Sequence, residues 1–239
     1  MSAEAAPYRL EPEQHTAAKI AGIFYLLMMI TGVSAEFYFR ARLDLAGDAL
    51  HNAASFAASE RLFRIGTITD LITFADDVVL VWALYIVLRP VSRNLALLAL
   101  CWRLIECAIN AVIMLNDFVA MRLMSGADYL EVFNTRQLQA LARLFINVQG
   151  EGFSIGFVFF GLGSAVFAYL WFKSHYIPRL LAAWGVFSAV VVAVVTLVIM
   201  VFPTLGDAVF PFHFVPVFIF ELTMGFWLLI KGIRPPLVT

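Results

Sequence analysis

Charge is what this sequence lacks. Only 14% of its 239 residues are charged and 62% are hydrophobic, whereas a soluble domain is roughly 45–50% apolar. Nucleic-acid-binding and disordered chains need more charge than this, and the formal net charge of −1 excludes a partner held by net electrostatic attraction. With a mean hydropathy of +0.89, the composition predicts an integral membrane protein that crosses the bilayer several times and binds no nucleic acid.

Cysteine and catalytic motifs are also scarce. Cys101 and Cys107 lie six residues apart, which turns them about 240° from each other on a helix, so we predict two buried thiols that do not face one another. The sequence has no CxxC, phosphate-binding loop, nucleophile elbow, HExxH motif or axial histidine pair. We therefore expect no cofactor and no metal, and no motif favours an enzyme.

Six apolar runs are long enough to cross about 30 Å of hydrocarbon at about 1.5 Å per residue. They cover residues 18–39, 62–88, 95–122, 151–172, 179–202 and 213–230. The breaks between them are short, so the sequence predicts an all-α, polytopic membrane bundle in one domain, 18–232, with tails 1–17 and 233–239. Because the first tail is acidic rather than basic, we expect an uncleaved first helix and not a signal peptide.

The charges of the short connections predict the orientation. Three of these regions carry bases and no acids: Arg89 with Arg93, Lys173 with Arg179, and Lys231 with Arg234. The positive-inside rule places them, and with six spans both termini, in the cytoplasm. All five tryptophans lie within about nine residues of these bases, as an interfacial belt requires.

The two longer outer connections look helical. Asp48 is a candidate N-cap for a short interfacial helix over residues 49–59, and Asn134 with Gln137 forms a capping signal for a second amphipathic stretch. The second stretch runs into Gly150 and Gly152, where we expect a kink before the fourth span. Gly152 and Gly156 also form a GxxxG pair, which we assign to packing within the chain, with a dimer interface as the alternative.

Four segments carry a family resemblance: "AEFYFR", "RLFRIGTITDL", "LRPVSRNLALLA" and "ELTMGFWLLIKGI". Together they resemble a bacterial integral-membrane family catalogued only as a domain of unknown function. The resemblance spans roughly residues 18–234. It implies a six-helix bundle in the bacterial cytoplasmic (inner) membrane and brings no catalytic or ligand-binding residues with it.

Several ionisable residues are expected inside the membrane, where each costs at least about 2.5–3.5 kcal/mol. Counting the helical rise from the cytoplasmic bases places Asp77, Arg103, Glu106 and Glu221 near the midplane. Helical spacing puts Asp70 on the face of Asp77, and Asn110 on the stripe of Arg103 and Glu106. The predicted interior site therefore comprises Asp70, Asp77, Arg103, Glu106, Asn110 and Glu221.

Two interpretations of this interior site are open. In one, a polar network locks the second, third and sixth spans together, with Arg103 paired to Glu106 or Glu221. In the other, the carboxylates outnumber the bases because the site binds or moves a small ligand, a proton or a lipid headgroup. The binding interpretation corresponds to a membrane protein that binds or moves a ligand or proton, and the network interpretation to an accessory or assembly subunit of a membrane complex. A lipid-modifying enzyme is a third candidate. Expected partners are membrane lipids and a homodimer or larger complex.

A second polar cluster is predicted near the outer interface. Its candidate members are Glu36, Asp70, Asn116, Asp117, Asn147, Gln149, Glu151 and His213, of which Glu36, Asp117, Glu151 and His213 are the main candidates. We prefer to explain these polar residues as side chains at helix ends, where water solvates them. Oxygen-rich ligands with one histidine would suit Mg²⁺, Ca²⁺ or Mn²⁺, but no histidine pair supports a metal site.

Overall fold

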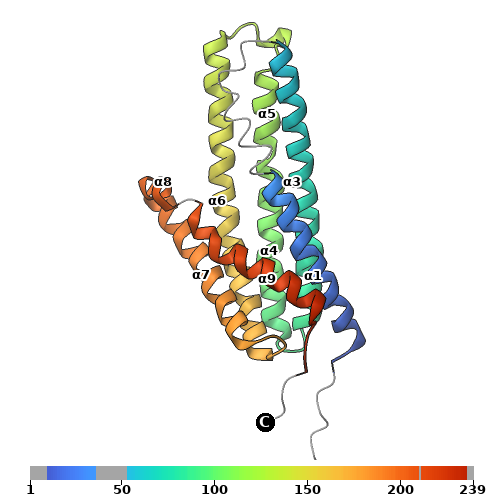
Figure 1. The fold of residues 1–239 in the computed structure, drawn as a ribbon. Helices are drawn as coiled ribbons and strands as arrows, with labels where there is room; N and C mark the ends of the chain where they lie inside the picture. Colours follow the sequence, from blue (N-terminus) through green and yellow to red (C-terminus); the bar gives the residue numbers. More distant parts are fainter. Residues whose placement is uncertain (1–9, 36–52, 210, 236–239) are drawn as a thin grey trace, which may run out of the picture.

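The structure, a computed structural model, describes residues 10–35, 53–209 and 211–235 (Figure 1). These residues are almost entirely helical, and no strand occurs among them. The elements in chain order are α1 (Pro12–Val33), α3 (Ala53–Leu88), α4 (Arg93–Ile113), α5 (Leu115–Leu123), η3 (Asp128–Leu130), α6 (Thr135–Ser174), α7 (Arg179–Val201), η4 (Pro203–Leu205), α8 (Gly206–Val209), η5 (Phe212–Phe214) and α9 (Val215–Ile230).

The prediction of six membrane-spanning helices is confirmed by length and composition. The segments concerned are Pro12–Val33, Arg61–Leu88, Arg93–Leu123, Thr135–Ser174, Arg179–Val201 and Phe212–Ile230. The start of α1 and the end of α9 lie at the same end of the bundle (Figure 1), as an even number of crossings requires. Which membrane side this end faces stays a prediction.

Local sequence signals explain where the helices begin. Pro12 occupies the first turn of α1, and the side chains of Glu11 and Gln14 form a reciprocal capping box. The expected cap of α6 is confirmed, because Asn134 Oδ1 accepts a hydrogen bond of 2.9 Å from the Gln137 backbone. At the other end of α6, His175 adopts a left-handed backbone conformation with φ of 58° and turns the chain toward α7.

The first outer connection is described only from residue 53 onward, so the predicted N-cap Asp48 and residues 49–52 lie outside the described part of the chain. Residues 53–59 belong to α3 instead of forming a separate interfacial helix. α6 runs through Gly150 and Gly152 without interruption, so these glycines do not end the helix, and the expected kink stays a prediction. A single glycine costs about 1 kcal/mol inside a helix but keeps its backbone N–H donor, so it does not by itself interrupt the hydrogen bonds of the helix. The chain instead breaks at Met114, between α4 and α5.

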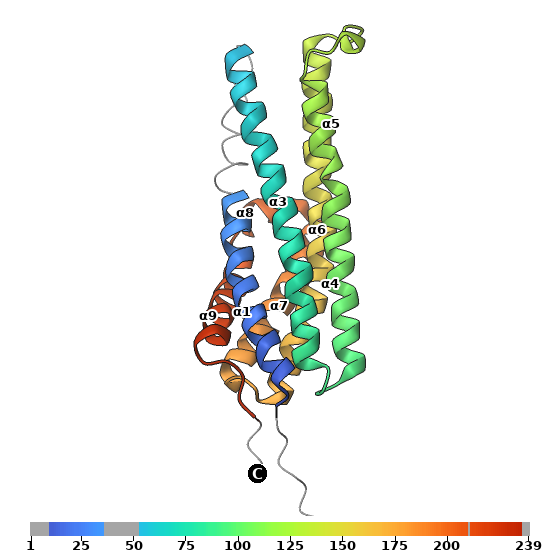
Figure 2. The same cartoon turned by 90° about the vertical axis from the view of Figure 1, so that its right-hand side faces the viewer.

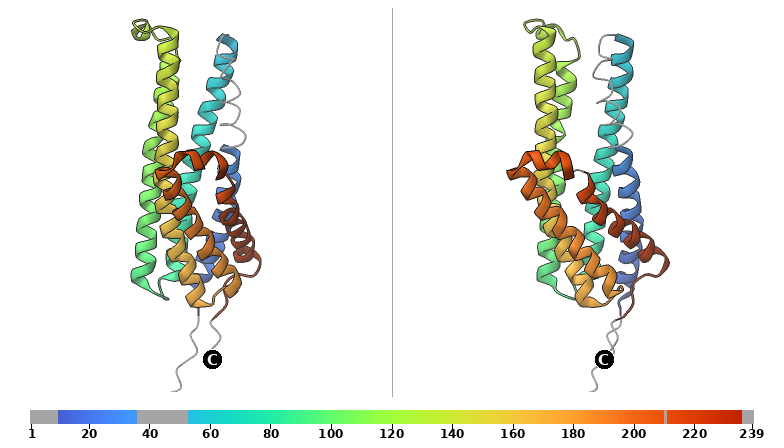
Figure 3. Two further views of the ribbon diagram at one scale, coloured as in Figure 1. Left: turned by 90° about the vertical axis from the view of Figure 1, so that its left-hand side faces the viewer. Right: turned by 60° about the vertical axis from the view of Figure 1, so that its left-hand side comes forward.

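The helices have very different lengths, and this shapes the molecule. α3 has 36 residues and α6 has 40, whereas α1, α7 and α9 have 22, 23 and 16. As a result α3, α5 and α6 continue past the shorter helices at the end opposite the termini (Figures 2 and 3). All six spans are side by side only in the other half, where the main apolar core gathers around Leu80, Val87, Trp171 and Met224.

Glycines allow the helices of this half to approach closely. A Cβ on Gly152 would lie 2.5 Å from Ile113 Cγ2, and one on Gly156 would lie 2.4 Å from Asn110 Oδ1, so both glycines pack against α4. Gly161 faces α7 in the same way, with Ala193 Cβ only 2.7 Å away. The assignment of the GxxxG pair to packing within the chain is therefore confirmed.

Candidate functional site

Arg103 forms the centre of a buried charged cluster. It lies in the middle of α4 and is 3% exposed. Its Nη2 forms an ion pair with Asp77 Oδ1 on α3, and its Nη1 donates a hydrogen bond of 3.2 Å to Ser164 Oγ on α6. The guanidinium carbon lies 4.1 Å from the centre of the Phe160 ring, also on α6. One side chain thus joins three helices.

Gly163 explains why Arg103 can reach α6. A Cβ on this residue would lie 2.7 Å from Arg103 Cγ and 3.0 Å from the carbonyl oxygen of Ala99. Because Gly163 has no side chain, the stem of the arginine lies flat against α6 and its head reaches Ser164, one residue further along. The position of the charge therefore depends on a close helix contact as well as on the ion pair.

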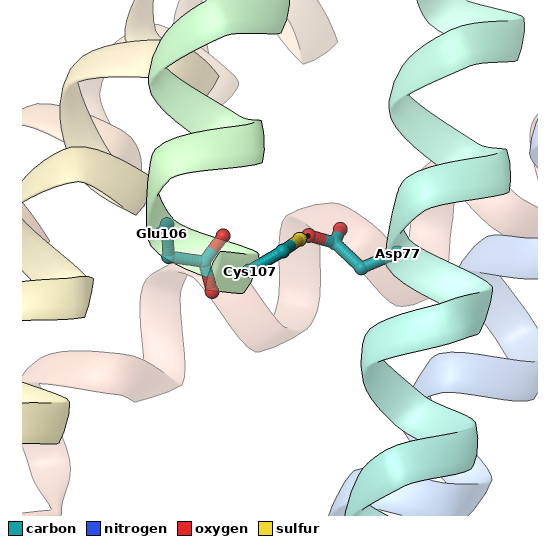
Figure 4. A group of neighbouring side chains, drawn as sticks. All are labelled: Asp77, Glu106 and Cys107. Atoms are coloured by element: carbon teal, nitrogen blue, oxygen red, sulfur yellow. Dashed lines mark hydrogen bonds between the residues drawn. The ribbon is translucent and has the colours of Figure 1, made fainter. Parts of the chain in front are cut away.

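Two residues beside Arg103 complete the network on α4. Cys107 Sγ donates a hydrogen bond of 2.8 Å to Asp77 Oδ2, so the two oxygens of Asp77 have different partners. Figure 4 shows Asp77 extending from α3 toward Cys107, with Glu106 on the neighbouring part of α4. Glu106 Oε2 lies 3.6 Å from Arg103 Nη1, and its Oε1 accepts a 2.8 Å hydrogen bond from Asn110 Nδ2.

Glu221 faces Arg103 from a different direction. It belongs to α9 and lines a small cavity together with Arg103, Ser164 and Tyr25 of α1. The volume of this cavity is about 10 Å³, close to the minimum that one water molecule requires. Glu221 is 5% exposed, and no hydrogen bond or ion pair with its carboxylate occurs within the described part of the chain.

The structure brings most of the predicted interior residues together. Arg103, Asp77, Glu106 and Asn110 are in contact, and Glu221 shares the cavity with Arg103. Of the partners predicted for Arg103, Glu106 is confirmed, whereas Asp77 takes the place expected for Glu221. Asp70 lies two turns from Asp77 on α3, about 10 Å along the helix, and is only partly buried. That these residues bind a ligand stays a prediction.

Three members of the cluster escaped the sequence analysis. Tyr25 and Ser164 are common, uncharged residues of apolar helices, and no spacing rule singled them out. The sequence predicts a buried thiol at Cys107, and this burial is confirmed. Its contact with the Asp77 carboxylate has no signal in the sequence. The same prediction is wrong for Cys101, which is exposed on the outer face of α4.

The described members of the predicted outer cluster belong to α3, α5, α6 and η5. That they gather at one site stays a prediction. Asp117 of α5 is buried and accepts a 2.5 Å hydrogen bond from Gln149 Nε2 of α6. His213 of η5 is buried, with its ring centre 3.9 Å from that of Phe214. Glu151 is exposed on α6, and Glu36 lies outside the described residues.

The charges of the interior cluster do not balance. Asp77, Glu106 and Glu221 contribute three carboxylates, and Arg103 is the cation among the described residues that contact them or share their cavity. An isolated carboxylate is very costly in an apolar interior, so the surplus calls for a proton, a cation or water. The cluster has the chemistry to hold any of these.

The fold and this cluster define a class of protein: a multi-pass helical membrane bundle with a charged centre between its spans. The chain belongs to the family described as Domain of unknown function (DUF4386), whose model matches residues 20–232. This confirms the family resemblance expected from the sequence. No curated protein and no solved structure matches the chain significantly.

Proposed function

We propose that this protein binds and exchanges protons at an intramembrane site formed by Glu221, Arg103 and the cavity between them, in the cytoplasmic membrane of a bacterium. The observation that carries the proposal is Glu221, a buried carboxylate without a hydrogen-bonding or ion-pairing partner among the described residues, on a cavity of about 10 Å³. The bacterial location rests on the family resemblance.

The contacts of Arg103 support this role for Glu221. The guanidinium is already bonded to Asp77 and Ser164 and lies 3.6 Å from Glu106. It therefore offers Glu221 only a positive charge across the cavity. A carboxylate in this position gains or loses a proton without breaking a salt bridge, and one water in the cavity would supply the path for that proton.

The size of the cavity supports a proton or a water over a larger ligand. Pockets for small molecules usually have volumes of about 300–1,000 Å³, whereas this one has about 10 Å³. A metabolite or a lipid headgroup would need the helices to separate. The small-ligand version of the function is therefore less well supported than the proton version.

Infrared difference spectroscopy on the purified protein tests proton binding directly. A pH change should produce a carboxylic acid band that shifts in D₂O and that disappears in Glu221→Gln. Glu151→Gln is the matched control, because Glu151 is an exposed glutamate on α6; it should leave the band unchanged. Absence of the band from the wild type, or its persistence in Glu221→Gln, would overturn the proposal.

Liposomes with a pH-sensitive dye inside test exchange across the membrane. We expect proton flux driven by a potassium diffusion potential in wild type and in Glu151→Gln, and loss of that flux in Glu221→Gln. A wild type that is no faster than empty liposomes would refute translocation, while the infrared band alone would still support a binding site.

A structural role for the cluster is the second candidate, and it corresponds to an accessory or assembly subunit. The observation that favours it is the bridging of α3, α4 and α6 by Arg103. A double-mutant cycle between Arg103 and Glu221 separates the two candidates. A strong coupling in stability, with unchanged proton exchange, would support the structural role and contradict the first proposal.

A further inference from the structure

We propose that Asp77, Glu106 and Cys107 form a binding site for one divalent transition-metal ion of the zinc type. One ligand atom from each residue lies within 4.8 Å of the other two, and all three residues are buried. Asp77 comes from α3, whereas Glu106 and Cys107 are neighbours on α4 (Figure 4). This site lies beyond the proposed proton function, because Glu221 is not one of its ligands.

The distances suit an ion after small side-chain rotations. Zinc binds sulfur at about 2.3 Å and carboxylate oxygen at about 2.0–2.2 Å, which separates two tetrahedral ligand atoms by about 3.6 Å. Cys107 Sγ and Asp77 Oδ2 are 2.8 Å apart and would move apart slightly, while a ligand atom of Glu106 already lies within 4.8 Å of both residues. Figure 4 shows the three side chains extending into the same space between α3 and α4.

A second observation comes from Glu106. The residue is 7% exposed, and no hydrogen bond reaches its Oε2 from the described residues. The nearby Arg103 Nη1, at 3.6 Å, forms an ion pair but is too far for a hydrogen bond. A buried carboxylate oxygen normally accepts at least one hydrogen bond, so Oε2 is a ligand atom whose hydrogen-bonding capacity the described residues leave unused.

Arg103 leaves the required oxygen of Asp77 available. The guanidinium binds Oδ1, whereas Oδ2 accepts the hydrogen bond of the Cys107 thiol. An ion that replaces the thiol proton would therefore keep the Arg103–Asp77 pair, in which the arginine orients the ligating carboxylate from outside. Such outer partners are usual for carboxylate ligands of metals.

The charges balance when the ion binds. The Sγ–H bond of Cys107 breaks, an Sγ–metal bond forms, and the proton leaves for the solvent without any change of oxidation state. Where the Glu106 carboxyl holds a proton, that proton leaves as well. Two carboxylates and a thiolate then face the divalent cation and the Arg103 guanidinium, so the group is neutral. A sulfur ligand favours zinc, cobalt or cadmium over Mg²⁺ and Ca²⁺, which prefer oxygen.

Cobalt titration of the metal-free, purified full-length protein tests the site. Co²⁺ bound through Cys107 should give a thiolate-to-cobalt charge-transfer band that saturates at one ion per chain, with at least one proton released per ion. Cys107→Ser should lose the band. Cys101→Ser is the matched control, because Cys101 is an exposed cysteine on the same helix, and it should keep the band and the affinity.

A second variant keeps the test independent of folding. Glu106→Gln retains the oxygen that accepts the Asn110 hydrogen bond, so the helix packing should persist and the metal-free thermal melts should match. We expect its affinity for Co²⁺ to fall more than about a hundredfold, because loss of an outer partner alone costs about 10–100-fold. No band in wild type, the same band in Cys107→Ser, or unchanged affinity in Glu106→Gln would overturn the site.

The same titration separates this site from the proton function. Glu221→Gln should bind Co²⁺ as the wild type does, whereas it should lose the infrared carboxyl band. Loss of metal binding in Glu221→Gln would contradict the three-residue site, and it would leave the proton proposal to be judged by its own spectroscopic test.

Discussion

Replacement of Gly161 by alanine should push α6 and α7 apart. A Cβ at this position would lie 2.7 Å from Ala193 Cβ, 2.8 Å from Ala193 N and 2.9 Å from the Ala189 carbonyl oxygen. Ordinary contact begins at 3.4 Å, so α7 has to move by roughly 0.5–0.7 Å. Two of the three atoms are backbone and cannot rotate away. Overpacking of this kind costs about 1–3 kcal/mol.

Gly150→Ala is the control on the same helix, since no atom lies within 4 Å of a Cβ there. Both substitutions gain about 0.8–1.0 kcal/mol of helix propensity, so their difference isolates the packing cost. Gly150→Ala should raise the free energy of unfolding, measured by SDS titration in mixed micelles, and Gly161→Ala should lie about 1–3 kcal/mol below it. Equal unfolding free energies for the two variants would refute the assigned packing of α6 on α7.

Three further variants probe the charges and the caps, with unfolding free energies as the common measurement. Arg103→Met leaves the buried Asp77 carboxylate without its cation and should cost about 3–5 kcal/mol, and addition of Asp77→Asn should restore part of it; no recovery would contradict the pairing. Asn134→Ala removes the α6 cap and should cost about 1 kcal/mol, with no loss expected if the cap is irrelevant. Glu13→Gln breaks an exposed ion pair of 2.8 Å with Arg89 and should change stability by less than about 1 kcal/mol.

Periodicity along one helix predicted the charged stripe of α4 correctly. Arg103, Glu106 and Asn110 are all buried on one face, as steps of three and four residues require. The pairing of Arg103 with Asp77 could not be predicted in the same way, because it depends on how α3 and α4 are placed relative to each other. That placement involves contacts such as Gly163 against Arg103, which a helical wheel does not contain.

Cys107 shows a second limit of periodicity. Neighbouring residues on a helix point about 100° apart, so Glu106 and Cys107 belong to different faces of α4. Asp77 of α3 nevertheless bonds to Cys107 while one ligand atom of Glu106 lies within 4.8 Å. A cluster formed by adjacent residues and a second helix has no repeat in the sequence, and only the three-dimensional structure reveals it.

The interruption of the third span, between α4 and α5, also depends on contacts between helices. The sequence offered Gly150 and Gly152 as breaking points in the fourth span, yet both remain helical. Gly152 instead faces Ile113, the last residue of α4, at a distance that admits no Cβ. The glycine thus serves the contact between α6 and the end of α4, directly beside the point where the other helix is interrupted.

The contact of α1 with α9 accounts for the position of Glu221, the residue proposed to bind a proton. A Cβ on Gly22 would lie 3.1 Å from the Gly225 carbonyl oxygen, so the two helices meet almost backbone to backbone at these residues. Tyr25 follows Gly22 by three residues and Glu221 precedes Gly225 by four, so each shares a helix face with the glycine of its own helix. The glycines therefore turn both polar side chains toward the interior, where they line the cavity with Arg103. The close contact of Gly22 with Gly225 therefore joins α1 to α9 and also brings the Glu221 carboxylate to the charged centre of the bundle.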